Sequence, residues 1–139
     1  MNWCILLLFL FQAGDSGAWL LVTAKATPFS EISKRELRQI YLQKLDRVGG
    51  TRVTPIHLSP EDPLRKTFEA WLFPPDFDLE GYWLLQRLQG GERVPFAAAN
   101  QAYVLVYVER NPGFIGYVSA DRRGELSQFD VKILGVVDR

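Results

Sequence analysis

Short apolar runs alternate along the chain with segments that begin at helix-capping residues, and this alternation limits the fold most strongly. The first run, Trp19–Ala24, is apolar and partly β-branched, which is typical of a buried strand. Ser33 and Glu36 then have the spacing of a capping box, which predicts a helix that runs to about Gln43. A strand followed by a capped helix is the first sign of an α/β domain.

The same alternation continues through the middle of the chain. Arg52–His57 is a second strand-like run, in which Pro55 indicates either an edge strand or a strand end. Asp62 and Pro63 then mark a helix start, because aspartate is a preferred N-cap and proline suits the first helical position. The residues that follow form one apolar stripe at helical spacing: Leu64, Phe68, Trp71 and Leu72.

A third helix is predicted from Asp78 to about Leu88. It carries Tyr82 and Trp83, which together with Trp71 have two interpretations. Such aromatic rings either stack on a ligand or pack in the core, and their helical spacing favours the core.

Residues 102–118 allow two readings. The β-branched runs 102–108 and 114–118 fit a β-hairpin, but they equally fit a helix that stops at Gly113 and a strand after it, because periodicity cannot settle a short apolar run. Residues 131–137 read as a last strand. The order of elements predicts an α/β fold with a mixed sheet flanked by helices.

The N-terminus has the pattern of a secretory signal. Trp3–Phe11 is uncharged and apolar, and it is too short for a membrane span, which needs about 20 residues. Ser16 and Ala18 supply small side chains before a cleavage point. We therefore expect a signal peptide at 1–18 and one domain at 19–139, the alternative being a buried first strand or helix of a cytosolic domain.

Composition limits the partners. Cys4, the only cysteine, precedes the apolar run instead of following it, so neither a lipid anchor nor a thiolate metal site is expected after cleavage. The 16 basic and 16 acidic side chains are interspersed, which excludes the electrostatic footprint of a nucleic-acid or anionic-membrane binder. No cofactor and no stable membrane insertion are predicted.

His57 is the only histidine, and it has two functional interpretations, a metal ligand or a general base. A metal site needs three or four ligands, and no nearby cluster of ligand residues supplies them. In a strand Ser59 lies on the same side as His57, so a catalytic pair is geometrically conceivable. No oxyanion or nucleophile-turn motif surrounds the pair, which disfavours catalysis.

Three segments in order resemble the phosphate-type substrate-binding proteins of bacterial ABC transporters. They are residues 32–44 with 50–56, then residues 59–68, and then residues 102–118, where that family has a helix ending in a Pro-Gly turn before a strand. The resemblance implies that Asn100–Arg110 is a helix. It also implies one α/β lobe of a two-lobed periplasmic binding protein.

The family's "SGTR..F" helix start implies a ligand site in the second segment. Arg65 matches the arginine, and Ser59 is the candidate for the serine that begins the loop. The Ser-Gly-Thr positions are instead Asp62, Pro63 and Leu64, which remove a hydroxyl and a donor amide and add a carboxylate. Glu61 adds another, so Arg65 has the alternative role of a surface arginine paired with Glu61 or Asp62.

The sequence therefore supports two hypotheses for function. The first is a non-enzymatic periplasmic solute-binding domain with Ser59 and Arg65 as ligand-binding residues for a small anion. The alternative is a module without ligand, which contacts an envelope protein or a second copy of itself.

Overall fold

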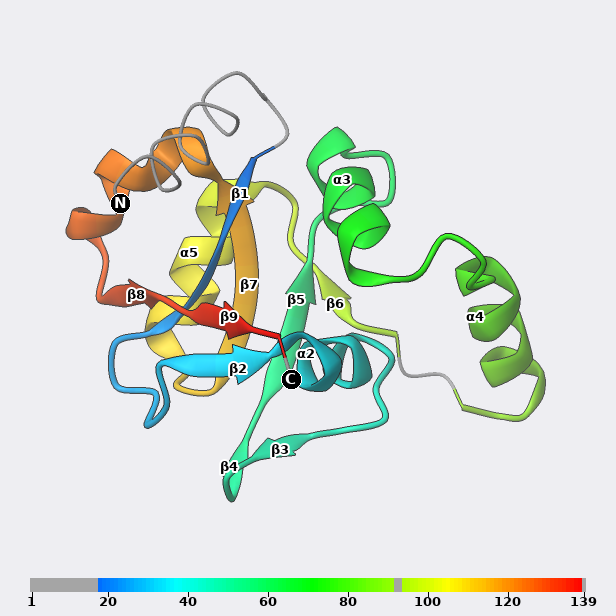
Figure 1. Ribbon diagram of the computed structural model, residues 1–139. Coiled ribbons are helices and arrows are strands. Elements are labelled where there is room, and N and C mark those ends of the chain that lie inside the picture. Colours follow the sequence, from blue (N-terminus) through cyan, green and yellow to red (C-terminus); the bar gives the residue numbers. More distant parts are fainter. Residues whose placement is uncertain (1–17, 92–93, 139) are drawn as a thin grey trace, which may run out of the picture.

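The computed structural model describes residues 18–91 and 94–138, so all of the expected signal segment except Ala18 lies outside the described residues. Its centre is a five-stranded sheet with the order β6-β5-β7-β1-β8 (Figure 1). The strands are β1 (Trp19–Ala24), β5 (Thr54–His57), β6 (Phe96–Ala97), β7 (Phe114–Ser119) and β8 (Val131–Ile133). β5 runs parallel to β6 and β7, whereas β1 is antiparallel to β7 and β8, which confirms a mixed sheet.

Two smaller strand pairs lie beside this sheet. β2 (Glu31–Ser33) pairs in parallel with β9 (Gly135–Val137). β3 (Arg47–Val48) and β4 (Thr51–Arg52) form a hairpin. The turn between them uses Gly49 and Gly50 at φ +55° and +85°, the left-handed region that glycine adopts without steric cost.

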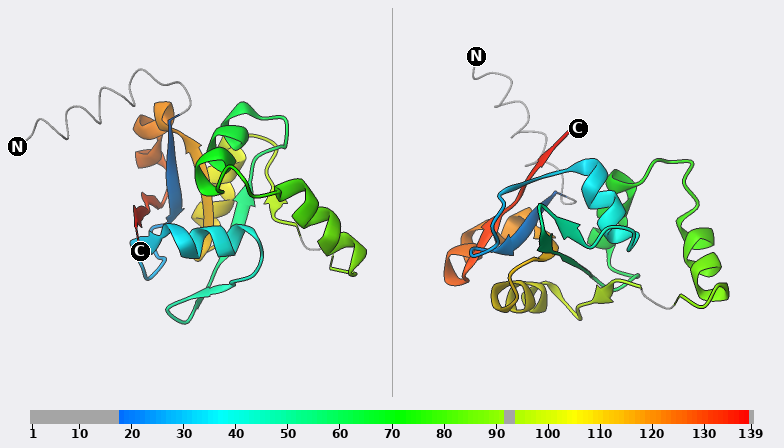
Figure 2. Two further views of the ribbon diagram at one scale, coloured as in Figure 1. Left: turned by 45° about the vertical axis from the view of Figure 1, so that its right-hand side comes forward. Right: turned by 90° about the horizontal axis from the view of Figure 1, so that it is seen from below.

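Helices cover both faces of the sheet (Figure 2). The helical segments are α2 (Lys34–Tyr41), α3 (Pro63–Leu72), α4 (Leu79–Leu88), α5 (Gln101–Arg110) and the 3₁₀ segment η1 (Ala120–Gln128). α5 lies on one face and α2 and α3 lie on the other, while α4 stands away from the sheet at one side (Figures 1 and 2). Within the described ranges, no helix combines the length and apolar character needed to cross a bilayer.

Each predicted helix start is confirmed by a capping contact. Ser33 and Glu36 form both hydrogen bonds of a capping box, at 3.0 and 3.1 Å. The Asp62 carboxylate accepts from the Leu64 backbone N–H at 2.8 Å, and the Asp78 carboxylate caps α4 in the same way. These contacts give hydrogen-bond acceptors to amides of the first helical turn that have no partner within the helix. Because each capping residue is close in sequence to the amide it binds, the helix starts can be predicted from the sequence.

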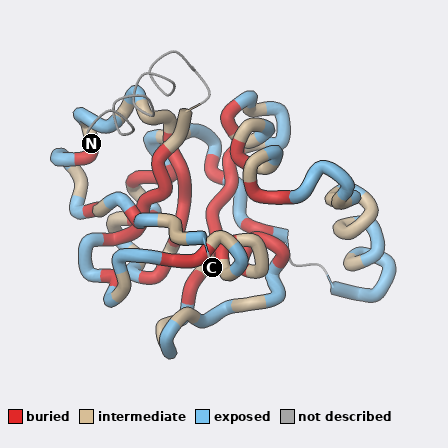
Figure 3. Tube along the Cα trace, in the orientation of Figure 1, coloured by how far each residue is buried: buried red, intermediate tan, exposed pale blue. Residues whose placement is uncertain are grey.

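The core on the α2 and α3 side is aromatic. Phe68 of α3 stacks on Tyr117 of β7 with ring centroids 4.0 Å apart, and Tyr41 of α2 packs edge-on against Phe68. Trp19 and Trp71 extend this cluster toward the surface. Figure 3 shows that buried positions follow the sheet strands and the inward sides of these helices.

Residues 101–110 form helix α5, so the reading implied by the family resemblance is confirmed and the hairpin is excluded. The Asn100 side chain accepts from the Tyr103 N–H at 3.0 Å and starts the helix. Gly116 of β7 lies beneath α5. A Cβ built there would lie 2.6 Å from Val104 Cγ1, so this glycine permits the close approach of helix and strand.

Three element boundaries differ from the prediction. The strand expected at Arg52–His57 is divided between β4 and β5, with Val53 in neither. Residues 131–137 form two strands instead of one, because the chain leaves β1 at Leu134, whose N–H donates to the Leu21 carbonyl at 2.8 Å, and then joins β2. Helix α2 ends at Tyr41 instead of about Gln43, which has a left-handed φ of +62° and stops the helix.

Pro55 does not mark an edge strand, because β5 lies between β6 and β7. Pro55 pairs with Ile115 of β7, and the ladder to β6 begins only at Ile56. The strand-end reading is therefore the correct one.

The core prediction for three aromatic side chains holds in part. Trp71 and Tyr82 are half-buried and pack against the core, Trp71 through contacts with Trp19 and Phe68. Trp83 is half-buried but is not among the side chains packed on the core, and none of the ten residues of α4 is fully buried. The helical spacing predicts the helix but not how far α4 stands from the sheet.

Candidate functional site

The candidate site lies where β5 ends and α3 begins. His57 is the last residue of β5, and Leu58 and Ser59 lead from it toward the helix start at Asp62. In sheets of this kind, ligands bind beyond the carboxyl ends of parallel strands, where helix N-termini also point. The predicted ligand-binding residues lie here, Ser59 in the loop and Arg65 in the first turn of α3.

The helix start at this site is occupied by carboxylates of the chain itself. The Asp62 carboxylate holds the Leu64 N–H, and Pro63 has no amide hydrogen to offer. The Ser59 hydroxyl donates to Glu61 Oε1 at 2.6 Å, and this hydrogen bond lowers the pKa of Glu61. An incoming anion would meet two negative groups where a free helix start would offer donors.

Arg65 lies in the same turn but is directed at other partners. Its Nε donates to Glu69 Oε2 at 3.1 Å, and its Nη1 donates to the Leu58 carbonyl at 2.9 Å. Its side chain is only 17% exposed. The predicted ion pair with Glu61 or Asp62 is replaced by one with Glu69, because residues four apart on a helix lie side by side.

His57 is buried, and its two ring nitrogens face different partners. Nδ1 lies 2.8 Å from Tyr117 Oη, and Nε2 lies 3.4 Å from Glu69 Oε2, longer than an ordinary hydrogen bond. Burial lowers the pKa of His57 well below its usual value, and the positive charge of Arg65 lowers it further. The imidazole is therefore neutral at neutral pH.

Tyr117 Oη is the shared partner of two groups at the end of β5. It accepts from the Leu58 N–H at 3.3 Å and forms a second hydrogen bond with His57 Nδ1. Burial also raises the pKa of Tyr117, which keeps the phenol protonated.

The contacts close into a ring that begins and ends at Leu58. Its members are the backbone N–H and carbonyl of Leu58 and the side chains of Tyr117, His57, Glu69 and Arg65. Among the described residues, every buried polar side-chain atom has a hydrogen-bond partner. The site is thus internally paired, and a ligand that takes Arg65 has to separate it from Glu69.

The structure places Ser59 in the loop before α3 and Arg65 in the first turn of that helix, but it does not join Ser59 to His57. The histidine faces Tyr117 and Glu69, and the serine faces Glu61. Sequence reasoning missed Glu69, although its position four residues after Arg65 is a usable signal. Tyr117 is 60 residues from His57 in sequence, and no local pattern points to it.

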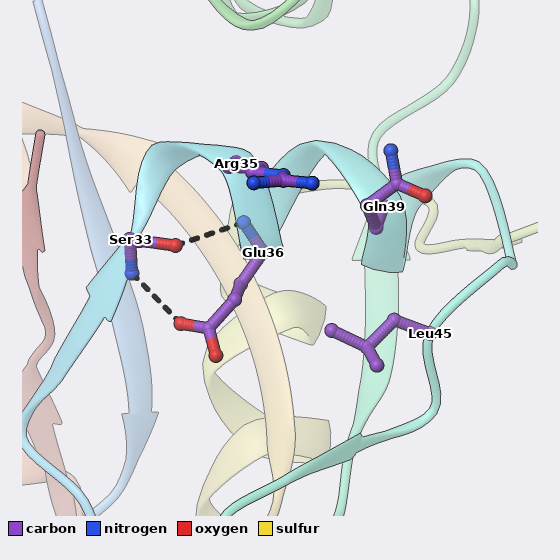
Figure 4. Close-up of a pocket in the computed structure, with 5 residues that line it drawn as sticks. All are labelled: Ser33, Arg35, Glu36, Gln39 and Leu45. Atoms are coloured by element: carbon purple, nitrogen blue, oxygen red, sulfur yellow. Dashed lines mark hydrogen bonds between the residues drawn. The ribbon is translucent and has the colours of Figure 1, made fainter. Parts of the chain in front are cut away.

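A second helix start, that of α2, lines a shallow pocket with Ser33, Arg35, Glu36, Gln39 and Leu45 (Figure 4). Here too a carboxylate of the chain, that of Glu36, takes the first amide through the capping box. In the part of the chain that the structure describes, no group of histidine, cysteine, aspartate and glutamate side chains is arranged to hold a metal ion.

Comparison with known proteins gives matches in structure alone. No family model matches the sequence, and no curated protein matches it. The PstS protein from Borrelia burgdorferi aligns with a TM-score of 0.69 and 15% identity, over 86% of this chain and 47% of that one. An ABC-type phosphate transport receptor from Vibrio cholerae aligns with a TM-score of 0.62 and 15% identity, over 88% and 48%.

A third match comes from Clostridium perfringens, an ABC transporter substrate-binding protein solved with bound phosphate. It aligns with a TM-score of 0.60 and 17% identity, over 91% of this chain and 50% of that one. The chain thus has the fold of phosphate ABC transporter substrate-binding proteins and spans about half the length of the solved structures it matches. The resemblance seen in the sequence is confirmed at the level of fold.

Proposed function

We propose that the chain is an exported, non-enzymatic lobe of the solute-binding-protein type that acts through contacts with proteins of the cell envelope. In this proposal it does not hold a small anion at the start of α3. The observation that carries the proposal is the internal pairing of that site, in which Asp62 takes the helix amide and Arg65 is held by Glu69.

The charges at the site support this choice. A helix N-terminus favours an anion by roughly 0.3–1 kcal/mol, and Asp62 already uses this interaction. A phosphate would also lie near the carboxylate of Glu61 and would have to take Arg65 away from Glu69 and Leu58. Separating a paired, partly buried guanidinium costs more than the helix dipole supplies.

The proposal that the chain is not an enzyme rests on His57. A general base needs a lone pair directed at a substrate, and both nitrogens of this buried ring face groups of the chain itself. We expect no hydrolysis in a screen of generic ester substrates. Turnover that disappears in His57→Ala and remains in a matched exposed-site variant, Arg123→Ala, would contradict this.

Isothermal titration tests the absence of anion binding. The chain, purified as the cell produces it, should give no heat with phosphate or sulfate, and Arg65→Ala should behave identically. The variant Asp62→Ser, Pro63→Gly, Leu64→Thr restores the donors of the family's helix start, so it should gain phosphate binding. Saturable binding by the unaltered chain that is lost in Arg65→Ala would overturn the proposal.

A second candidate function is direct binding of a small anion by Ser59 and Arg65. It is favoured by the match to a structure with bound phosphate and by the position of Arg65 in the first turn of α3, just after the end of β5. In this version Arg65 exchanges Glu69 for the ligand, and the same titration decides between the two.

Export to the periplasm is the remaining part of the proposal. Cleavage after Ala18 would leave β1 whole, because that strand starts at Trp19. Fractionation of the producing cell should recover the protein with Trp19 as its first residue. Recovery from the cytoplasm with Met1 in place would contradict export.

A further inference from the structure

Helix α4 exposes an apolar side that nothing in the described chain covers. Leu84 and Leu85 are 49% and 51% exposed, and Leu88 is 75% exposed. The three side chains lie on adjacent turns of a helix that stands away from the sheet (Figures 1 and 2). A cluster of exposed leucines on a small domain marks a contact surface.

The opposite side of α4 holds the helix to its own domain. The Tyr82 hydroxyl donates to the Leu42 carbonyl at 2.7 Å, and the Lys44 ammonium lies 5.3 Å from the centre of the Tyr82 ring. Apolar or aromatic side chains therefore occur on both sides of this helix, a pattern typical of helices that are covered on both sides.

The charges of α4 indicate what covers the leucines. Glu80 and Arg87 are its only charged residues, and both are exposed. They are seven residues apart, which places them on the same flank of the helix two turns apart. A second α4 lying antiparallel about a twofold axis would bring each Glu80 near the other copy's Arg87, whereas a parallel twofold pair would place the charged flanks of the two copies on opposite sides of the contact, where they form no pairs.

We propose that the exposed side of α4 is a self-association surface, where a second copy of this chain packs its own α4 antiparallel about a twofold axis. The leucines meet at the centre and two Glu80–Arg87 pairs form beside them, so the surface is complementary to itself, as a twofold interface requires. The balanced charge of α4 lacks the basic face by which a surface helix binds an anionic membrane.

The proposal rests on the proposed interaction function and deepens it by naming the partner. An interface centred on three leucines is smaller than the roughly 800 Å² per partner of standard stable complexes. We therefore expect a weak dimer, which forms as the protein concentration rises.

Sedimentation equilibrium over a range of concentrations tests the proposal. The apparent mass should rise from one chain toward two. Leu88→Glu should weaken association at least tenfold, and the distant exposed substitution Arg123→Glu should leave it unchanged. Because Leu88 is largely exposed, far-UV circular dichroism should show that its variant remains folded.

Charge reversal tests the antiparallel geometry. Glu80→Arg alone and Arg87→Glu alone should each be monomeric, because each places like charges at both contacts. An equimolar mixture of the two variants should dimerise again, and so should the double variant carrying both substitutions.

A chain that stays monomeric at every concentration overturns the inference, and so does a dimer that is insensitive to Leu88→Glu and to both reversals. These failures differ from failure of the proposed function. A monomer that gives no heat with phosphate and retains another envelope protein in a pull-down would refute self-association alone. Phosphate binding through Arg65 would refute the proposed function whatever the state of association.

Discussion

Tyr117 joins β7 to β5 through its hydroxyl group and to α3 through its ring. From its place in β7 it contacts the His57 ring at the end of β5 and the Leu58 amide, and its own ring stacks on Phe68 of α3. The side chain therefore contributes packing through the ring and pairing through the oxygen. These two contributions can be measured separately.

Tyr117→Phe removes the oxygen and keeps the stacked ring. The His57 nitrogen and the Leu58 amide then lose their partner inside the core, which should lower the free energy of unfolding by about 1–3 kcal/mol. Urea denaturation measures this difference. Tyr103→Phe, at a residue that is 50% exposed, is the matched control and should change stability little.

The pH dependence of stability should follow His57. Because burial holds the pKa of His57 well below the value of about 6.5 that it has in an unfolded chain, the folded state stays neutral while the unfolded state takes up a proton. The contribution is complete above pH of about 6.5, and it is lost as the pH falls below that value. The titratable groups that face the ring are Tyr117, Glu69, Arg65 and Tyr41.

Urea denaturation at a series of pH values between about 7.5 and 5 measures this effect, in a range centred on the ordinary histidine pKa. The free energy of unfolding should decrease toward acid, and His57→Gln should flatten the slope. An equal slope in the two proteins would show that other groups cause the acid sensitivity.

At the scale of elements, the contact of α5 with β7 depends on Gly116. Gly116→Ala places a methyl group 2.6 Å from Val104 Cγ1, so α5 has to shift. Overpacking of this kind costs about 1–3 kcal/mol of stability. Thermal and urea denaturation should show this loss, and the double variant Gly116→Ala, Val104→Ala should recover part of it.

The control for this prediction is Gly124→Ala. A Cβ built at Gly124 has no atom within 4 Å, so the substitution should be nearly neutral. If both alanine variants lose the same stability, the loss comes from glycine's backbone and not from the contact with α5.

Helix starts were predictable because their causes are local. Ser33, Asp62 and Asp78 each bond to an amide two or three residues away. β2 and β6 were not predicted, because each short strand is defined by pairing with a strand far away in the sequence. β2 pairs with β9, and β6 pairs with β5. The boundary between β8 and β9 was missed for the same reason, since it depends on where β1 and β2 end.

At the scale of the molecule, the sequence predicts where the candidate site lies, but not that its side chains are paired with one another. The family resemblance placed Ser59 and Arg65 at a helix start, and the structure has Ser59 in the loop before α3 and Arg65 in its first turn. Whether Arg65 can bind a ligand depends on its ion pair with Glu69 and on the ring of contacts that Tyr117 of β7 completes. The sequence shows that Asp62 stands where the family has a hydroxyl residue. The ring of contacts, in contrast, can be seen only in the three-dimensional structure.

The strand order has a consequence for how the chain is made. β1 lies near the start of the described chain, and its edge is covered by β8, which lies near the other end. The central sheet is therefore incomplete until the residues of β8 are available, and folds built on such distant pairings form slowly. If the chain is exported as proposed, we expect this delay to keep it open long enough to be threaded through a narrow translocation channel.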